Sequence, residues 1–108
     1  MSDKIYSLKS VSPVDGRYKQ KTSIFSEYFS EYALIKYRVY IEIKYFIELT
    51  NSNIKDLDGI TDENIKDIDS IQSGFKVEDA LKIKEIEKAI NHDVKAVEYF
   101  IKERFTEM

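Results

Sequence analysis

Two short stretches of the sequence carry residue types that bind anions or move protons. The first is SPVDGRY, residues 12–18, in which Arg17 and Tyr18 follow the strongest turn signal of the chain. A guanidinium fork matches two oxygens of a phosphate, and a phenol hydroxyl donates a third hydrogen bond. The pattern is typical of an anion clamp, but a structural turn that merely exposes an arginine has the same composition.

The second stretch is NHDVKAVEYF, residues 91–100, which contains His92, the single histidine of the chain. We expect Asn91 to cap a helix here, with His92 and Asp93 at the end where backbone N–H groups point outward. Such an end favours anions, and a histidine there can hold a phosphate or carboxylate or transfer a proton. The alternatives are a histidine merely tolerated in a first turn and an aspartate that only interacts with the helix dipole.

No other pattern in the sequence is typical of a catalytic centre. The chain has no cysteine, one histidine and only three glycines. It therefore offers no thiolate nucleophile, no pair of histidines for a metal and no glycine-rich phosphate loop. We expect neither a metal nor a cofactor. Acidic pairs such as Glu78 with Asp79, and Glu85 with Glu87, are interpreted as helix starts and solvated faces.

Length and charge restrict the function further. The 108 residues suit one domain with a modest core, and 17 basic against 20 acidic residues, well mixed, give a formal net charge of -3. This balance argues against a nucleic-acid surface. No apolar run approaches the roughly 18 residues of a membrane span, and the first residues lack the apolar core of a secretory signal. We expect a soluble cytoplasmic protein that binds neither nucleic acid nor membranes.

The elements that position the two stretches are predicted to be helices. Thr22 and Ser23 are candidate caps of a short helix after the turn, and Ser30 is a candidate cap of a long helix that reaches Leu49. Residues 51–59 form a polar break. The prediction is an all-α fold with one long central helix, three or four shorter helices and an N-terminal turn loop.

Three helices are expected after the polar break. The first covers residues 61–71, with Thr61 as its cap and Gly74 beyond its end; the second covers 77–89, and the third starts near Asn91. The apolar positions that share a helical face, and so are predicted to face the core, are Ile65, Ile68 and Ile71, then Ala80, Ile83, Ile86 and Ile90, and finally Val94, Val97, Ile101 and Phe105.

The long helix of residues 30–49 carries apolar and aromatic side chains around most of its circumference. A surface helix of a globular protein has one apolar stripe instead. Two interpretations remain open: a central helix covered by its own neighbours, with tyrosine hydroxyls at the rim, or a helix whose second face belongs against protein outside this chain.

Three segments taken together resemble the N-terminal domain of adenylosuccinate lyase, in the fumarase/aspartase superfamily. They are SVSPVDGRY at residues 10–18, FSEYALIKYRVYIEI at 29–43 and IKEIEKAINHDVKAVEYFIKE at 83–103. The likeness covers nearly the whole chain in the expected order and spacing, and it is weakest between Asn51 and Lys76. The related argininosuccinate lyases and fumarases do not open in this way.

The resemblance implies a lyase of purine biosynthesis that releases fumarate from adenylosuccinate to give AMP, and from SAICAR to give AICAR. It implies that Arg17 and Tyr18 bind the nucleotide phosphate and that Asn91, His92 and Asp93 contact the substrate. His92 is assigned mainly to binding, with an auxiliary role as an acid as the alternative. The family implies a homotetramer and no cofactor.

The chain also departs from that family. Its members have several hundred residues, with a central helical bundle that supplies the catalytic histidine and a mobile loop that supplies the serine base. Residues 1–108 are expected to be a single helical domain without the central bundle and the C-terminal domain, inactive alone and binding nucleotides at best near the millimolar level. Exposed faces of the long helix favour self-association. The alternative is an autonomous helical interaction module without catalysis.

Overall fold

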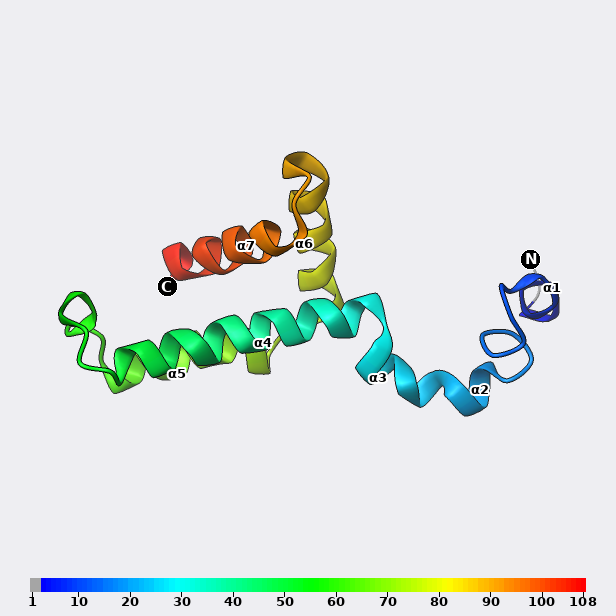
Figure 1. Ribbon diagram of the computed structural model, residues 1–108, viewed down its shortest axis with the longest axis horizontal. Helices are drawn as coiled ribbons and strands as arrows, with labels where there is room; N and C mark the ends of the chain where they lie inside the picture. Colours follow the sequence, from blue (N-terminus) through cyan, green and yellow to red (C-terminus); the bar gives the residue numbers. More distant parts are fainter. Residues whose placement is uncertain (1–2) are drawn as a thin grey trace. The chain divides into compact units, whose positions relative to one another are not determined.

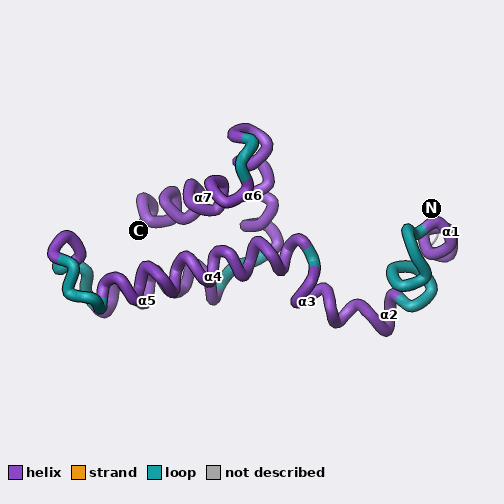
Figure 2. The backbone as a smooth tube through the Cα atoms, in the orientation of Figure 1, coloured by secondary structure: helices purple, strands orange, loops and turns teal. Residues whose placement is uncertain are grey.

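The computed structural model describes residues 3–108, and every regular element in that range is a helix (Figures 1 and 2). This confirms the all-α prediction. None of the described helices is long and apolar enough to cross a membrane.

The chain divides into two compact units, Met1–Ala33 and Leu34–Met108. The elements are α1 (Asp3–Lys9), α2 (Lys19–Thr22), the 3-10 helix η1 (Ser23–Phe25), α3 (Ser26–Phe29), α4 (Glu31–Thr50), the 3-10 helix η2 (Lys55–Leu57), α5 (Asp62–Ser73), α6 (Val77–Ile90) and α7 (Asp93–Glu107).

The N-terminal unit begins with α1, which the sequence analysis did not predict, and continues through the turn loop into α2, η1 and α3 without a break. The predicted caps Thr22 and Ser23 are wrong. The backbone is already helical there, because the N–H groups of Lys21 and Thr22 donate to the carbonyl oxygen of Tyr18. The Thr22 hydroxyl instead donates to the carbonyl oxygen of Val14 at 2.9 Å, which fastens the loop to the helix.

Ser30 separates α3 from α4, as predicted. Its backbone is extended, with ψ at 164°, so the helix must break at this residue. Its hydroxyl oxygen accepts a hydrogen bond from the N–H of Ala33 at 3.0 Å and so caps the new helix.

In the C-terminal unit α4 and α5 form an antiparallel hairpin through the turn at residues 51–61 (Figure 1). The Thr61 hydroxyl accepts from the N–H of Asn64 at 3.1 Å, and the Asn64 side chain accepts from the Thr61 N–H at 3.0 Å. This capping box starts α5, and Gly74 ends it, both as predicted. Across the hairpin, Lys44 Nζ lies 2.9 Å from Asp69 Oδ1.

Helix α7 runs in the same direction as α4. Its first residue, Asp93, contacts Arg38, and near its end Phe105 packs against Phe46 with ring centroids 5.2 Å apart. Helix α6 leads into α7 and packs against it. The buried apolar residues of this unit, supplied by α4, α5, α6, α7 and one linker residue, are Ile35, Val39, Ile43, Ile68, Ile71, Phe75, Ala80, Ile83, Ala96, Val97 and Phe100.

The predicted core stripe is correct in α5, in the first half of α6 and at Val97 of α7, but it is wrong at the end of α6 and at the start of α7. Ile90 and Val94 are exposed, whereas Ala96 and Phe100 are buried. Phe100 meets Phe75 edge-on at 5.9 Å. Ile90 is the last residue of α6 and Val94 lies in the first turn of α7, so the two exposed residues flank the connection between these helices.

Helix α4 has two apolar faces on opposite sides. Ile35, Val39 and Ile43 are at most 5% exposed and form the core face. Leu34, Tyr37, Ile41 and Tyr45 follow one another at spacings of three and four on the other side and are 41–63% exposed. We call these four residues the outer face of α4. The helical neighbours in the described chain therefore cover only half of the apolar circumference.

Asp79 corrects the interpretation of acidic pairs as solvated. Its carboxylate is buried beside Arg104, with Oδ1 2.6 Å from Nη2, and Oδ2 accepts the backbone N–H of Lys76 at 2.9 Å. The neighbouring Glu78 is exposed, as expected. Asp79 therefore lies in the first turn of α6 and also forms a buried ion pair, because α7 places Arg104 beside that turn.

Candidate functional site

The SPVDGRY loop is held by hydrogen bonds between its own residues. The Ser12 N–H donates to Asp15 Oδ1 at 2.9 Å, and the Val14 N–H donates to the Ser12 hydroxyl oxygen at 3.0 Å. The Gly16 N–H donates to the Ser12 carbonyl oxygen at 3.1 Å. These short-range contacts are those expected for Ser and Asp in turns, so the sequence itself dictates the loop conformation.

Gly16 is the one buried residue of the loop. A Cβ atom built at this position would meet the backbone carbonyl oxygen of Ser7, and its next contact would be the Ser10 side chain at 3.2 Å. Glycine is therefore needed here for close approach to the end of α1, not for an unusual backbone angle. The contact places the following residues, Arg17 and Tyr18, at the start of α2.

Arg17 and Tyr18 are in contact through their side chains. The guanidinium carbon of Arg17 lies 5.3 Å from the centroid of the Tyr18 ring, which is the geometry of a cation–π contact. Both side chains are exposed. The pair offers the guanidinium fork and the phenol hydroxyl expected of an anion clamp.

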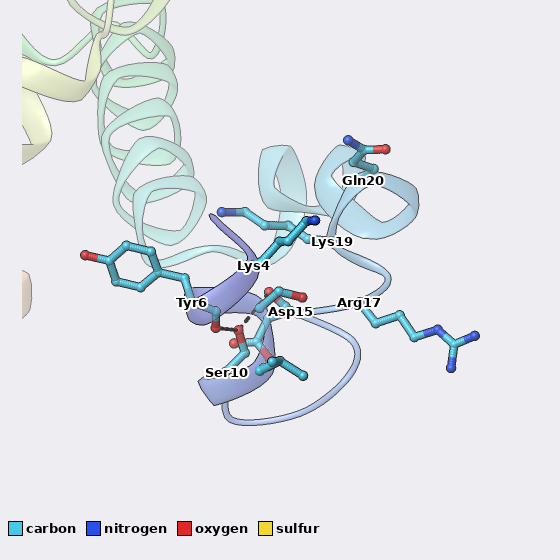
Figure 3. Close-up of a pocket in the computed structure, with 10 residues that line it drawn as sticks. Lys4, Tyr6, Ser10, Asp15, Arg17, Lys19 and Gln20 are labelled. Atoms are coloured by element: carbon cyan, nitrogen blue, oxygen red, sulfur yellow. Dashed lines mark hydrogen bonds between the residues drawn. The ribbon is translucent and has the colours of Figure 1, made fainter. Parts of the chain in front are cut away.

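A cavity of about 780 Å³ lies between α1, the loop and the start of α2 (Figure 3). Its charged lining residues are Lys4, Asp15, Arg17 and Lys19. In Figure 3 the Arg17 side chain extends away from the other labelled side chains. Sequence reasoning did not find this cavity, because α1, which supplies one of its walls, was not predicted.

The second predicted stretch forms the connection between α6 and α7, and its caps differ from the prediction. Asn91 is not the N-cap of α7. It adopts the left-handed conformation, with φ at 60° and ψ at 35°, and ends α6. His92 is extended and is itself the N-cap. Asparagine is the commonest non-glycine residue in the left-handed region, so Asn91 suits the helix end as well as it suits a cap.

His92 uses one ring nitrogen to hold the helix. Its Nδ1 accepts the backbone N–H of Lys95 at 3.2 Å. In this arrangement Nδ1 carries no proton, so the proton of the neutral ring is on Nε2. The ring is exposed. His92 therefore offers an Nε2–H donor to a ligand while Nδ1 is engaged by the protein.

Asp93 lies in the first turn, as predicted, and has two partners. Its Oδ1 accepts the N–H of Val94 at 2.8 Å, and its Oδ2 lies 3.2 Å from Nη1 of Arg38. The backbone N–H, followed by the positive charge of Arg38, lowers the pKa of Asp93 below its ordinary value. Arg38 is a participant that sequence reasoning missed, because nothing in the spacing of the two residues connects them.

The backbone N–H groups expected to receive an anion are mostly occupied. Those of Val94 and Lys95 donate to the side chains of Asp93 and His92, and that of Ala96 donates to the His92 carbonyl oxygen. The expectation of a vacant helix end is therefore wrong. What this end offers instead is the Nε2–H of His92 and the guanidinium of Arg38, which is about one-third exposed.

The predicted site residues fall into two groups, one in each unit. Arg17 and Tyr18 adjoin each other in the N-terminal unit, while Asn91, His92 and Asp93 follow one another in the C-terminal unit, where Asp93 pairs with Arg38. Within the part of the chain that the structure describes, no group of three or more His, Asp or Glu side chains is arranged to hold a metal ion.

Several known proteins that resemble this chain are adenylosuccinate lyases. It is 54% identical over 99 residues to an adenylosuccinate lyase of Dictyostelium discoideum, 46% over 101 residues to one of Legionella pneumophila strain Corby and 45% over 103 residues to one of Escherichia coli K12. These matches cover 90%, 93% and 94% of this chain. They cover only 21%, 22% and 23% of the relatives, so the chain spans about a fifth of their length. No protein-family model matches. By sequence the chain is a homologue of the adenylosuccinate lyases over a segment of about a hundred residues.

Proposed function

We propose that this chain supplies substrate-binding residues of an adenylosuccinate lyase, which releases fumarate from adenylosuccinate to give AMP and from SAICAR to give AICAR. The observation that carries the proposal is identity of 45–54% to adenylosuccinate lyases across at least 90% of the chain. Residues 1–108 correspond in this proposal to the N-terminal domain of the enzyme. The cytoplasmic location and the homotetramer implied by the resemblance belong to the same proposal.

Arg17 and Tyr18 are proposed to bind the nucleotide phosphate. A phosphate held by a guanidinium fork and a phenol hydroxyl receives charge-assisted hydrogen bonds in a fixed direction. The stacking of Arg17 on the Tyr18 ring supports this role, since it limits the freedom of the guanidinium before a ligand arrives. The hydrogen bonds within the loop of residues 12–18 also support this role, because they hold the backbone of both residues.

His92 is proposed to hold the substrate through its Nε2–H, with Asn91 and Asp93 beside it. The hydrogen bond from Lys95 to Nδ1 sets the ring orientation and leaves the donor nitrogen exposed. In the same proposal Asp93 orients Arg38, whose positive charge favours an anionic substrate near the start of α7. An auxiliary role of His92 as an acid would require the imidazolium form, in which Nδ1 is protonated and no longer accepts the Lys95 N–H.

We propose further that the chain alone does not catalyse the elimination. Removing a proton and protonating a leaving group require an acid and a base fixed on either side of the substrate. The chain has one histidine, which is already an N-cap, and no cysteine. The residues described above bind and orient; the reacting groups must come from other polypeptide segments.

A second function, an interaction module without catalysis, is favoured by one observation. The outer face of α4, formed by Leu34, Tyr37, Ile41 and Tyr45, remains exposed although it is apolar. Faces of this kind occur at protein interfaces. A partner, or a second copy of the chain, would cover it.

The two functions are separated by titrating the 108-residue chain with AMP and following the His92 imidazole by proton NMR. The substrate-binding proposal expects a saturable shift with a dissociation constant near about 1 mM, since a partial site retains only a few contacts. Arg17→Ala should weaken this binding, and Lys21→Ala, a matched loss of one positive charge on α2, should not. Absence of any response at about ten times that AMP concentration would contradict the proposal for this chain.

A further inference from the structure

Of the residues assigned to the proposed nucleotide site, Arg17 alone lines the cavity between α1 and the start of α2. We propose that this cavity binds a small dianion, with the chemistry of a phosphate group, through Lys4 and Lys19. This site is separate from the Arg17–Tyr18 pair, whose guanidinium extends away from the other labelled lining residues (Figure 3).

The charge of the lining favours an anion. Three of the four charged residues around the cavity, Lys4, Arg17 and Lys19, are positive, and Asp15 is the one carboxylate. Without Arg17, which belongs to the proposed nucleotide site, the lining still carries one net positive charge in a protein whose overall net charge is -3. A phosphate group carries nearly two negative charges at neutral pH, which the two lysine ammonium groups can balance.

Hydrogen bonds within the cavity wall occupy two of its polar side chains, so the two lysines are the groups that can bind a ligand. Asp15 is drawn into the loop, because its Oδ1 accepts the Ser12 N–H. The Ser10 hydroxyl is likewise occupied, since it donates to the Tyr6 carbonyl oxygen at 2.7 Å. Neither lysine, by contrast, makes an ion pair with any side chain that the structure describes.

The fold brings the two lysines together from separate elements. Lys4 belongs to α1 and Lys19 to α2, and the close approach of Gly16 to the Ser7 carbonyl oxygen holds α1 against the loop. Two ammonium groups that line one cavity repel each other, and a bound dianion removes this repulsion. Gln20 also lines the cavity.

The test is an NMR titration of the isotopically labelled chain with inorganic phosphate, at low salt and neutral pH. We expect saturable amide shifts concentrated at Gly16, Lys19 and Gln20, and weaker binding at higher ionic strength. The double variant Lys4→Gln/Lys19→Gln should weaken phosphate binding about five- to tenfold, because it removes two exposed charge contacts. Lys21→Gln is the matched control: it removes one charge from α2 at a residue that does not line the cavity, and it should bind as the wild type does.

Two results would overturn the inference. One is a double variant that binds phosphate as well as Lys21→Gln does; the other is a set of shifts that never saturates or is spread over the whole chain. A parallel AMP titration identifies the source of the phosphate group. Competition between AMP and phosphate at the cavity supports a nucleotide, and phosphate binding without competition supports the free anion. If phosphate binds through the two lysines while AMP leaves His92 unaffected, the cavity site stands and the proposed function fails.

Discussion

The two units of the chain are stabilised in different ways. In the C-terminal unit, eleven apolar residues are buried, and Phe75 and Phe100 pack edge to face at its centre. In the N-terminal unit, the described residues that are buried are Gly16 and Ala33, whereas Val11 is 99% and Phe29 83% exposed. One unit therefore relies on apolar burial and the other on hydrogen bonds between near neighbours in sequence.

Because of this difference, we expect the core of the C-terminal unit and the loop that presents Arg17 and Tyr18 to differ in local stability. Burial of apolar area supplies most of the free energy that opposes unfolding, while local hydrogen bonds contribute modestly and mainly select a conformation. We expect the loop that presents Arg17 and Tyr18 to open at low cost and the core around Phe100 to open only with global unfolding. The exposed apolar side chains of the N-terminal unit are further candidates for contact with other polypeptide.

The strongest test of this comparison exchanges one phenylalanine for alanine in each unit. Phe100→Ala should reduce the free energy of unfolding by about 3–5 kcal/mol, because a large side chain that is 2% exposed leaves a cavity. Phe29→Ala should reduce it by less than about 0.5 kcal/mol, since the ring is already in solvent. Urea unfolding followed by circular dichroism measures both. Equal losses would show that the N-terminal unit contributes to the core.

The buried ion pair between α6 and α7 gives the next largest effect. Asp79→Asn should cost about 2–3 kcal/mol, because Arg104 is left without its counter-charge in a partly buried position. The neighbouring Glu78→Gln is the matched control and should cost less than about 0.5 kcal/mol at its exposed position. Urea unfolding of both variants gives the comparison, and an unchanged stability of Asp79→Asn would mean that the pair is not formed in solution.

Substitutions of His92, the N-cap of α7, distinguish its structural role from its proposed binding role. His92→Ala removes the acceptor of the Lys95 N–H and should cost about 1 kcal/mol, whereas asparagine is a good N-cap and should restore most of that loss. Both variants lack the imidazole, so both should lose AMP binding if the ring holds the substrate. Retained AMP binding in a stable His92→Asn protein would leave His92 with the capping role alone.

The smallest expected effect is the pH dependence of stability that arises from the exposed Lys44–Asp69 ion pair across the α4–α5 hairpin. The hydrogen bond from Lys44 lowers the pKa of Asp69 below its ordinary value of 3.8. A carboxylate with a lowered pKa stabilises the fold above that ordinary value, and this contribution is lost as the pH falls through the folded-state pKa. The same bond raises the pKa of Lys44 above 10.5, so that contribution is complete below 10.5 and disappears as the pH rises through the higher value.

Lys44→Met tests this pH dependence. In the variant the Lys44–Asp69 pair is absent, so its contribution to the free energy of unfolding cannot be lost in acid. The difference in stability between wild type and variant should therefore shrink as the pH falls below about 4. Unfolding midpoints measured over a series of pH values give the comparison. A constant difference between the two proteins across the acid range would show that Asp69 does not titrate through this contact.

The sequence predicted much of the local structure. Thr61, Gly74 and Ser30 marked helix boundaries correctly, because capping involves atoms within three or four residues of the cap. It predicted the wrong cap at α7, where asparagine suits either the end of one helix or the start of the next. Residue preference alone does not decide between these, and the left-handed backbone of Asn91 assigns it to the end of α6.

By itself, then, the sequence determined that the chain is helical, where most helices begin and end, and which family it resembles, since these follow from local pattern and from residue order. Tertiary structure alone decided which face of α4 is buried, that Asp79 meets Arg104, that Arg38 meets Asp93, and that α1 closes a cationic cavity beside the loop. The physical reason is that burial and ion pairing depend on side chains brought together from distant positions, and periodicity within one helix says nothing about which neighbour will cover it.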